Sequence, residues 1–193
     1  MSFRFEEQSI PGVYVITPQI RGDSRGYFVE TFKRPDFEAI GITRDFVQDN
    51  ESLSSKGVLR GLHFQKEHTQ GKLVRAMAGS IYDVVVDVRP NSPTFGKYTG
   101  TVLDSEKKQM LWVPEGFAHG FLVLSDTVIF TYKCTDVYDP ASEGGIPWND
   151  PDIAVDWPKL DVAYRTSDRD GMHPRFKAQS FEWAEKFYKE GWK

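Results

Sequence analysis

Short apolar runs separated by turn residues recur along most of this chain. Within each run, β-branched and aromatic residues alternate with polar ones, and Gly, Pro, Asn or Asp punctuate the ends. Many such runs at regular spacing predict an all-β sandwich or barrel. The pattern predicts strands at residues 12–18, 26–32, 57–65, 72–78, 80–89, 98–103, 109–113, 120–124 and 127–138.

Two segments have the spacing of helices instead. Residues 35–40 predict one short helix with Pro35 in its first turn, where a missing N–H is tolerated. In residues 179–189 the apolar side chains recur near the helical period, and Ser180 is the expected N-cap of a C-terminal helix. The stretch 140–174 is rich in Pro, Gly, Asp and Trp and predicts a long loop.

Composition places the chain among globular domains, with 193 residues, 39% hydrophobic and 27% charged. A prior of roughly 150 residues per domain predicts one domain with a tail. The net charge of -4 argues against a nucleic-acid partner, and the lone Cys134 excludes an intrachain disulfide framework. Because the N-terminus has no apolar run, and no stretch nears the ~18 apolar residues of a membrane span, we expect a cytoplasmic protein with no membrane partner.

Histidines are the first candidates for chemistry, and only four are present: His63, His68, His119 and His173. His119 ends a Pro-x-Gly-x-x-His pattern, which is seen in cupins, small jelly-roll barrels that often bind a divalent metal. Cupins usually also have an earlier motif with two metal-binding histidines separated by one residue. In this sequence His63 stands in the first of these two places and Gln65 in the second. Because glutamine is a poor ligand for a transition metal, we expect no metal site.

Proton transfer is the second possibility. A histidine can act as a base near neutral pH if a carboxylate orients it. Spacing leaves several candidate carboxylates open: Asp83, Asp87, Asp168 and Asp170. Arg60 and Lys72 flank His63 on the same or the next predicted strand and could hold an oxyanion. Since residues of equal parity share a strand face, Arg60 and His63 reach one cavity only if the strand bends, as Gly61 allows.

Longer motifs succeed one another in a specific order. They are DSRGYFVE (23–30), QDNES (48–52), GVLRGLHFQ (57–65), QGKLV (70–74), DVVVDVR (83–89), SPTFG (92–96), VPEGFAHGFL (113–122), YKCT (132–135), WNDPD (148–152), DWP (156–158) and SDRD (167–170). Together they resemble the dTDP-4-dehydrorhamnose 3,5-epimerase family over roughly residues 3–172. The resemblance implies one epimerase domain over residues 1–172, with 173–193 as a helical extension of the same domain. The resemblance implies a metal-free, cupin-like jelly-roll barrel without a cofactor, a homodimer, and a dTDP-linked 4-keto-6-deoxy sugar as the partner.

The resemblance also implies a role for each matching residue. His63 would be the base, Asp170 would pair with it and favour its imidazolium, Lys72 would stabilise the enolate oxygen, and Tyr132 would return a proton on the opposite face. Residues implied to bind the substrate are Arg25, Phe28, Glu30, Gln48, Asn50, Arg60, His119, Tyr138, Glu143 and Arg169. Of these, Phe28 and Tyr138 would stack on the thymine, one of them across a dimer interface. Many family members have lysine where Arg169 stands, and the charge is kept.

The implied chemistry fits these residue types. A ketone at carbon 4 acidifies the protons on carbons 3 and 5, so inversion needs a base on one face, an acid on the other and a cation at the oxyanion. We therefore expect dTDP-4-dehydro-6-deoxy-D-glucose to be converted to dTDP-4-dehydro-L-rhamnose. The alternatives are a single-carbon (3- or 5-) epimerase of another dTDP-4-keto-deoxysugar pathway, a metal-dependent cupin oxygenase, and a non-catalytic sugar-binding module.

Overall fold

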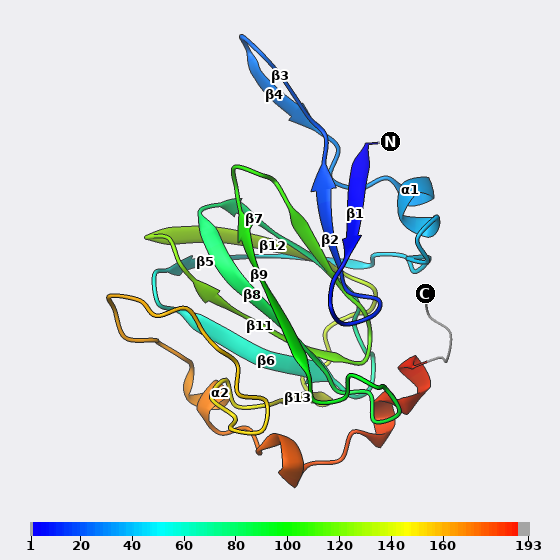
Figure 1. The fold of residues 1–193 in the computed structure, drawn as a ribbon, viewed down its shortest axis with the longest axis vertical. Coiled ribbons are helices and arrows are strands. Elements are labelled where there is room, and N and C mark those ends of the chain that lie inside the picture. The colour runs from blue at the N-terminus through cyan, green and yellow to red at the C-terminus, as the bar shows by residue number, and fades with distance from the viewer. Residues whose placement is uncertain (1, 189–193) are drawn as a thin grey trace.

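Two antiparallel sheets form the body of the protein in the computed structural model, which describes residues 2–188 (Figure 1). The six-stranded sheet has the order β1 (Phe3–Glu7), β2 (Tyr14–Pro18), β10 (Met110–Val113), β7 (Lys72–Ala78), β12 (Thr127–Cys134), β5 (Gln48–Ser55). The five-stranded sheet has the order β13 (Glu143–Gly145), β6 (Leu59–Gln65), β11 (Phe117–Val123), β8 (Ser80–Asp87), β9 (Tyr98–Asp104). Neighbouring strands are mostly distant in sequence, which confirms the predicted all-β jelly-roll barrel.

Apolar side chains fill the space between the sheets and also cover the outer face of the five-stranded sheet. The inner cluster joins Val74 and Phe130 of one sheet to Val85 and Phe121 of the other. The outer cluster is formed by side chains of opposite parity together with residues that come after the barrel strands: Leu62, Phe64, Val84, Val86, Ala118, Leu122, Trp157, Phe176, Phe181 and Ala184. Because both faces are covered, the residues of β8 and β11 are almost continuously buried rather than alternately buried and exposed.

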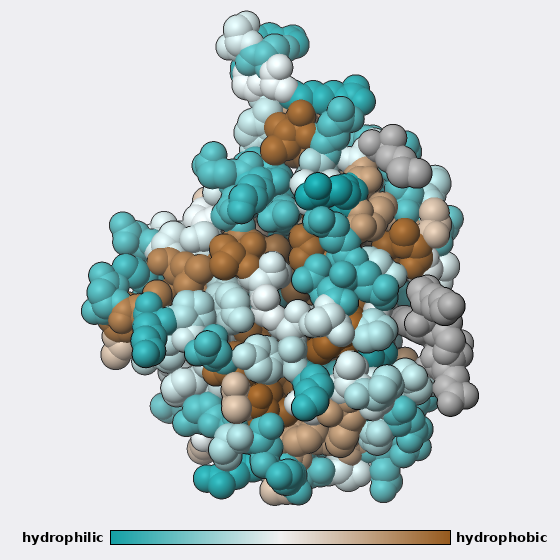
Figure 2. Space-filling model, in the orientation of Figure 1, coloured by the Kyte–Doolittle hydropathy of each residue, from teal (hydrophilic) through white to brown (hydrophobic). Residues whose placement is uncertain are grey.

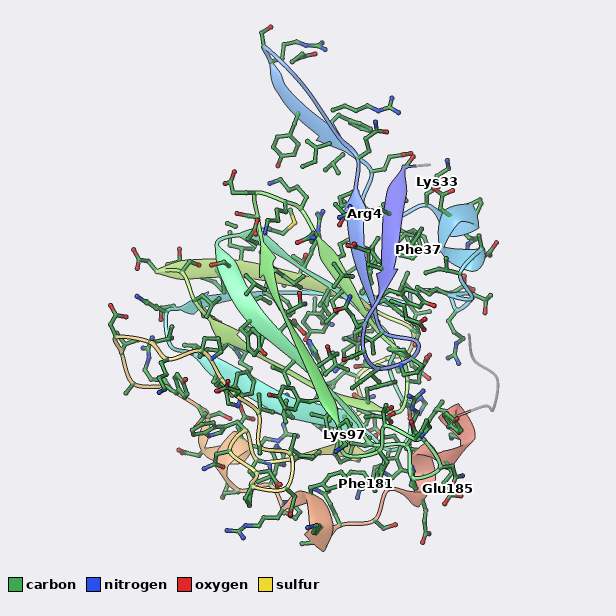
Figure 3. The ribbon with its side chains drawn as sticks, viewed as in Figure 1. Arg4, Lys33, Phe37, Lys97, Phe181 and Glu185 are labelled. Atoms are coloured by element: carbon green, nitrogen blue, oxygen red, sulfur yellow. The ribbon has the colours of Figure 1, made fainter. Side chains whose placement is uncertain are left out.

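A two-stranded hairpin of β3 (Ile20–Asp23) and β4 (Gly26–Val29) projects away from this body (Figure 1). Apart from its last residue, the hairpin is exposed. At its base, α1 (Arg34–Glu38) packs Phe37 edge-on against Phe3, with ring centroids 5.3 Å apart, and Figure 3 shows this side chain directed from α1 toward β1. Figure 2 shows hydrophobic surface at the base of the hairpin and in a band across the strands below it.

Most predicted elements are present, and four strands were not predicted: β1, β3, β5 and β13. The short helix with a proline in its first turn is confirmed as α1. Within the stretch predicted as loop lies a short helix, α2 (Asp168–Gly171), and a 3₁₀ turn, η1 (Phe176–Ala178), comes after it. Among the described residues, no helix has the length and apolar character needed to cross a membrane.

The predicted C-terminal helix is present, but it is shorter than predicted and of the 3₁₀ type rather than the α-helical period. Residues Glu182–Phe187 form a 3₁₀-helix, η2, whose N-cap is Phe181, while the Ser180 hydroxyl accepts only a 3.3 Å hydrogen bond from the Glu182 N–H. Residue 189, the end of the prediction, lies outside the described residues. A 3₁₀-helix aligns residues three apart, which sets Phe181 and Ala184 in line against the outer face of the five-stranded sheet. Figure 3 shows Phe181 at this lower end of the barrel.

Candidate active site

A cavity of about 640 Å³ opens into the barrel between the two sheets. Its walls come from β5, β6, β7, β11 and β12, and its rim from the segment after β12 and from α2. Eleven of the residues implied by the resemblance line it: Gln48, Asn50, Arg60, His63, Lys72, His119, Tyr132, Tyr138, Glu143, Arg169 and Asp170. One cavity thus gathers candidate bases, acids and cations from segments far apart in the chain.

A histidine–carboxylate pair stands in the wall formed by β6. The Nε2 atom of His63 lies 2.7 Å from Asp170 Oδ1, and the Asp170 side chain is only 6% exposed. The hydrogen bond to a carboxylate assigns the proton on this ring to Nε2, so Nδ1 is the nitrogen that can accept another proton. Of the carboxylates that spacing left open, the structure pairs Asp170 with His63.

The Asp170 carboxylate is held in its ionised form. Burial alone would raise its pKa, but the hydrogen bond and charge of His63 and bonds from Ser167 and the Gly61 backbone lower the pKa below its ordinary value. Ser167 also caps α2, because its hydroxyl accepts the Asp170 N–H. The short helix therefore fixes the carboxylate that orients the candidate base.

The bend expected between Arg60 and His63 is present. His63 is paired with His119, and Arg60 with Phe121, so three residue steps on β6 face two on β11. One extra residue on a strand reverses the parity of the residues beyond it, which lets both side chains line the cavity. Gly61 makes this possible: its φ is +119°, and a Cβ there would lie 2.5 Å from the backbone of Gly120.

A second histidine–carboxylate pair lies beside the first. His119 Nε2 is 2.8 Å from Asp83 Oδ1, in an almost fully buried position. Burial raises the pKa of Asp83, and the charges of His119 and Lys72 oppose that effect. Asp83, one of the carboxylates that spacing left open as a partner for His63, therefore anchors His119 instead.

Lys72 and Cys134 are cross-strand partners on β7 and β12. Burial lowers the pKa of Lys72, an effect that the negative charges of Glu143 and Asp83 oppose. The thiol of Cys134 is buried, which raises its pKa to about 11 and makes it a poor nucleophile at neutral pH. Of this pair, Lys72 is the residue that lines the cavity.

Tyr132 lies on the sheet opposite His63. It belongs to β12 of the six-stranded sheet, whereas His63 belongs to β6 of the five-stranded sheet, and both line the cavity. Burial raises the pKa of the Tyr132 phenol, with Arg60 opposing the shift. The phenol is therefore protonated at neutral pH, the form in which it can act as an acid.

The rim carries a hydrogen-bonded group of polar side chains. Glu143 accepts a hydrogen bond from Tyr138 and forms an ion pair with Arg169. The contacts with Tyr138 and Glu143 raise the pKa of Arg169. On β5, Gln48 donates to Asn50 at 3.0 Å and accepts the Tyr138 N–H at 2.8 Å. This arrangement sets guanidinium and amide groups at the mouth of the cavity.

Three residues implied to bind the substrate do not reach this cavity. Arg25 forms an ion pair with Asp23 at 2.6 Å near the tip of the projecting hairpin. Phe28, on the same hairpin, is 66% exposed, and Glu30 comes after it at the hairpin base. Because β3 and β4 pair only with each other, this chain holds the three residues away from its own cavity.

The cupin-type ligand set is not available here. Gln65, in the place of the second cupin histidine, donates to the carbonyls of His68 and Val137 at 2.7 and 3.1 Å and accepts the Asp139 N–H at 3.1 Å. Its amide thus joins the β6–β7 turn to the segment after β12. The position has a structural role, in agreement with its unsuitability as a metal ligand.

One neighbour of the candidate base was not predicted. The ring of His173 meets the His63 ring edge-on, with centroids 5.7 Å apart. Burial and the charge of His63 lower the pKa of His173, so its ring is neutral at neutral pH. No spacing rule joins residues 110 positions apart in a loop-rich segment, so the sequence offered no signal for this contact.

Comparison with known proteins agrees with this geometry. Residues 7–178 match the family model described as dTDP-4-dehydrorhamnose 3,5-epimerase. A protein of that name from Methanothermobacter thermautotrophicus is 55% identical over 156 residues, covering 81% of this chain and 84% of the relative. A crystal structure of the Legionella pneumophila epimerase with dTDP-4-keto-L-rhamnose superimposes with a TM-score of 0.90 at 46% identity, covering 94% and 96% of the two chains.

A related enzyme of different specificity also matches. The structure of a 3'-monoepimerase from Streptomyces bikiniensis with dTDP-quinovose has a TM-score of 0.82 at 34% identity, covering 94% of this chain and 90% of that chain. The fold is thus shared by enzymes that differ in how many carbons they invert. On the family model and on the relatives of 46–55% identity, this chain is an isomerase that belongs to the dTDP-4-dehydrorhamnose 3,5-epimerase family.

Proposed function

We propose that this enzyme inverts carbons 3 and 5 of dTDP-4-dehydro-6-deoxy-D-glucose to give dTDP-4-dehydro-L-rhamnose. The observation that carries the proposal is the placement of His63 and Tyr132 on facing sheets of one cavity. A base and an acid on opposite sides of a sugar ring are what inversion requires, because the proton must leave from one face and return to the other.

Each inversion proceeds through an enolate. Nδ1 of His63 removes the proton next to the ketone, and Asp170 stabilises the imidazolium that forms. The electron pair of the C–H bond moves onto the ketone oxygen, where Lys72 stabilises the negative charge. Tyr132 then donates its proton to the carbon from the opposite face. Proton exchange with water restores the base and the acid, so solvent hydrogen enters each inverted carbon.

We infer that the working unit is a homodimer whose hairpins complete each other's sites. The exposed hairpin holds an arginine and an aromatic side chain, Arg25 and Phe28, which suit a diphosphate and a nucleobase but do not reach the cavity of their own chain. A second copy of the chain is the partner that would use them. The substrate would then be bound by Tyr138 and Arg169 of one chain and the hairpin of the other. We also propose that the enzyme acts in the cytoplasm, with which a single buried thiol is consistent.

Product analysis tests the proposal. The purified protein, incubated with dTDP-4-dehydro-6-deoxy-D-glucose in the presence of EDTA, should yield a product whose proton NMR couplings report inversion at both carbons. Inversion at one carbon would support the single-carbon alternative, which the fold shared with a 3'-monoepimerase keeps open. Loss of all turnover on addition of the chelator would support the oxygenase alternative, and substrate binding without turnover would support the sugar-binding module.

A further inference from the structure

A third metal-ligand side chain stands beside the His63–Asp170 pair. His173 contributes an imidazole, and one donor atom from each of the three residues lies within 4.8 Å of the other two. The Nε2 atom of His173 is buried and has no hydrogen-bond partner. A buried polar atom without a partner is costly, so this ring nitrogen is available for a ligand.

The backbone holds these three donors in place. Gly145 of β13 is paired with His63 of β6, and the His173 ring lies against Gly145 so closely that a Cβ there would be 2.5 Å from Nε2. Asp170 belongs to α2, and His173 comes directly after Met172, the C-cap residue of that helix. The donors therefore come from a strand and from one short turn packed beside it, rather than from mobile surface groups.

We propose that His63, Asp170 and His173 form a zinc site whose occupation inhibits the enzyme. Two imidazoles and one carboxylate, with the fourth position open, form a ligand set typical of zinc. Zinc bonds of about 2.0–2.2 Å place tetrahedral donors roughly 3.3 Å apart. The His63–Asp170 contact of 2.7 Å must therefore open slightly, and the three donors, which lie within 4.8 Å of one another, must adjust to that spacing. Imidazole donors favour zinc over magnesium or calcium, which prefer oxygen ligands. The open position would face the cavity that His63 and Asp170 line.

Inhibition is a consequence of the tautomer of His63. The proton on Nε2 is donated to Asp170, and zinc can bind Nε2 only when that proton is absent. The neutral ring then carries its proton on Nδ1, the nitrogen that must be free to accept a proton from the sugar. Zinc would also remove the contact between Asp170 and the base. This inhibitory part rests on the proposed function, whereas zinc binding itself does not.

Direct binding is the test that does not depend on activity. The full-length protein, stripped of metal, is titrated with zinc in competition with a chromogenic chelator. The wild type is expected to bind one zinc ion per chain. His173→Gln is expected to bind zinc at least roughly 10–100-fold more weakly, which is the loss that changes around a metal site typically cause. His68→Gln is the matched control, because His68 also pairs with a carboxylate, Asp136 at 3.3 Å, but lies on the surface. It should bind zinc as the wild type does.

The outcomes separate zinc binding from inhibition. The site is overturned if the wild type binds no zinc, or if His173→Gln binds zinc as tightly as the wild type does. It is also overturned if His68→Gln loses as much zinc affinity as His173→Gln does. A circular-dichroism melt of each metal-free variant shows that it is folded, and a zinc-dependent rise in the Tm of the wild type that is absent in folded His173→Gln supports the site independently. Zinc that binds through His173 but leaves turnover intact overturns inhibition alone. Absence of turnover in EDTA would count against the proposed function, not against the zinc site.

Discussion

Asp170 accepts a hydrogen bond from His63 at 2.7 Å, although 107 residues separate them in the chain. The carboxylate comes from a four-residue helix and the imidazole from the middle of a strand. Because both side chains are fixed by secondary structure, the ring is held in one tautomer, with Nδ1 as the nitrogen that can accept a proton. The proposed base is therefore oriented before the substrate binds.

Asp170→Asn tests this orientation. The amide keeps the shape of the carboxylate but cannot compensate an imidazolium, so kcat should fall by about 10²–10⁴. Asp168→Asn, in the first turn of the same helix, is the control and should retain most of the activity. Steady-state kinetics with a CD melt of each variant make the comparison. A folded Asp170→Asn enzyme with wild-type kcat would rule out a role for the pair.

Lys72 should set the alkaline limit of kcat/KM. Burial lowers its pKa below that of an ordinary lysine and raises the pKa of Tyr132, so both shifts favour loss of the ammonium charge, rather than ionisation of the phenol, as the alkaline limit. Activity should thus decline as the pH rises through the lowered pKa of Lys72. In Lys72→Arg the guanidinium stays charged, and the decline should move to higher pH. An unchanged alkaline limb in this variant would show that another group controls it.

Tyr132→Phe should impair reprotonation more than proton abstraction. His63 is untouched, so solvent deuterium should still reach the carbon by return to the original face, while inversion falls by about 10²–10⁴. The ratio of exchange to inversion, measured by NMR in D2O, should rise. Tyr82→Phe is the control, because Tyr82 packs against Trp157 outside the cavity. Equal losses of exchange and inversion in Tyr132→Phe would argue against an acid role.

Phe181→Ala should destabilise the whole barrel. The side chain is 4% exposed and stacks on Phe176 with centroids 5.0 Å apart, in the cluster that covers the five-stranded sheet. Phe→Ala changes in a core cost about 3–5 kcal/mol, which urea unfolding measures. Glu185→Ala, at an exposed position of η2, should cost less than about 0.5 kcal/mol. A small loss in Phe181→Ala would mean that the segment is not part of the cooperative core.

Mixing two defective variants tests whether the hairpin acts across a dimer. Neither His63→Ala nor the double variant Arg25→Ala/Phe28→Ala should work well alone at low substrate concentration. A mixed dimer joins an intact cavity to an intact hairpin in one of its two sites, so refolding equal amounts together should restore about a quarter of wild-type activity. Mixing His63→Ala with Asp170→Asn, both defective in the cavity, is the control and should restore none. No recovery in the first mixture would contradict the shared site.

Periodicity predicted most of the strands that carry apolar side chains, with β1 (FRFEE) as the exception, and it missed the more polar strands β3, β5 and β13. β5, with the sequence QDNESLSS, has no apolar alternation because Gln48, Asn50 and Ser52 on one of its faces line the cavity. The polar residues that let β5 line the cavity therefore also remove the apolar alternation by which a strand is predicted from sequence. The C-terminal helix was predicted with the wrong period, since apolar residues three apart, here Phe181, Ala184 and Phe187, fit a 3₁₀-helix as well as an α-helix.

The sequence predicted only those site residues that lie in the recognised motifs. Motifs brought His63, Lys72, Tyr132 and Asp170 together, and the cavity they share agrees with that grouping. They did not reveal that Asp83 holds His119, because a partner on an adjacent strand depends on register. They also gave no sign of His173, whose contact with His63 depends on the path of a loop.

The central claim is that one base and one opposed acid invert two carbons of the sugar. Proton NMR of the reaction in D2O with EDTA tests it most directly, with wild type and His63→Ala side by side. We expect deuterium at both carbon 3 and carbon 5 of an inverted product from the wild type, and exchange at neither carbon with His63→Ala. Deuterium at a single carbon, or substantial exchange without His63, would contradict the account.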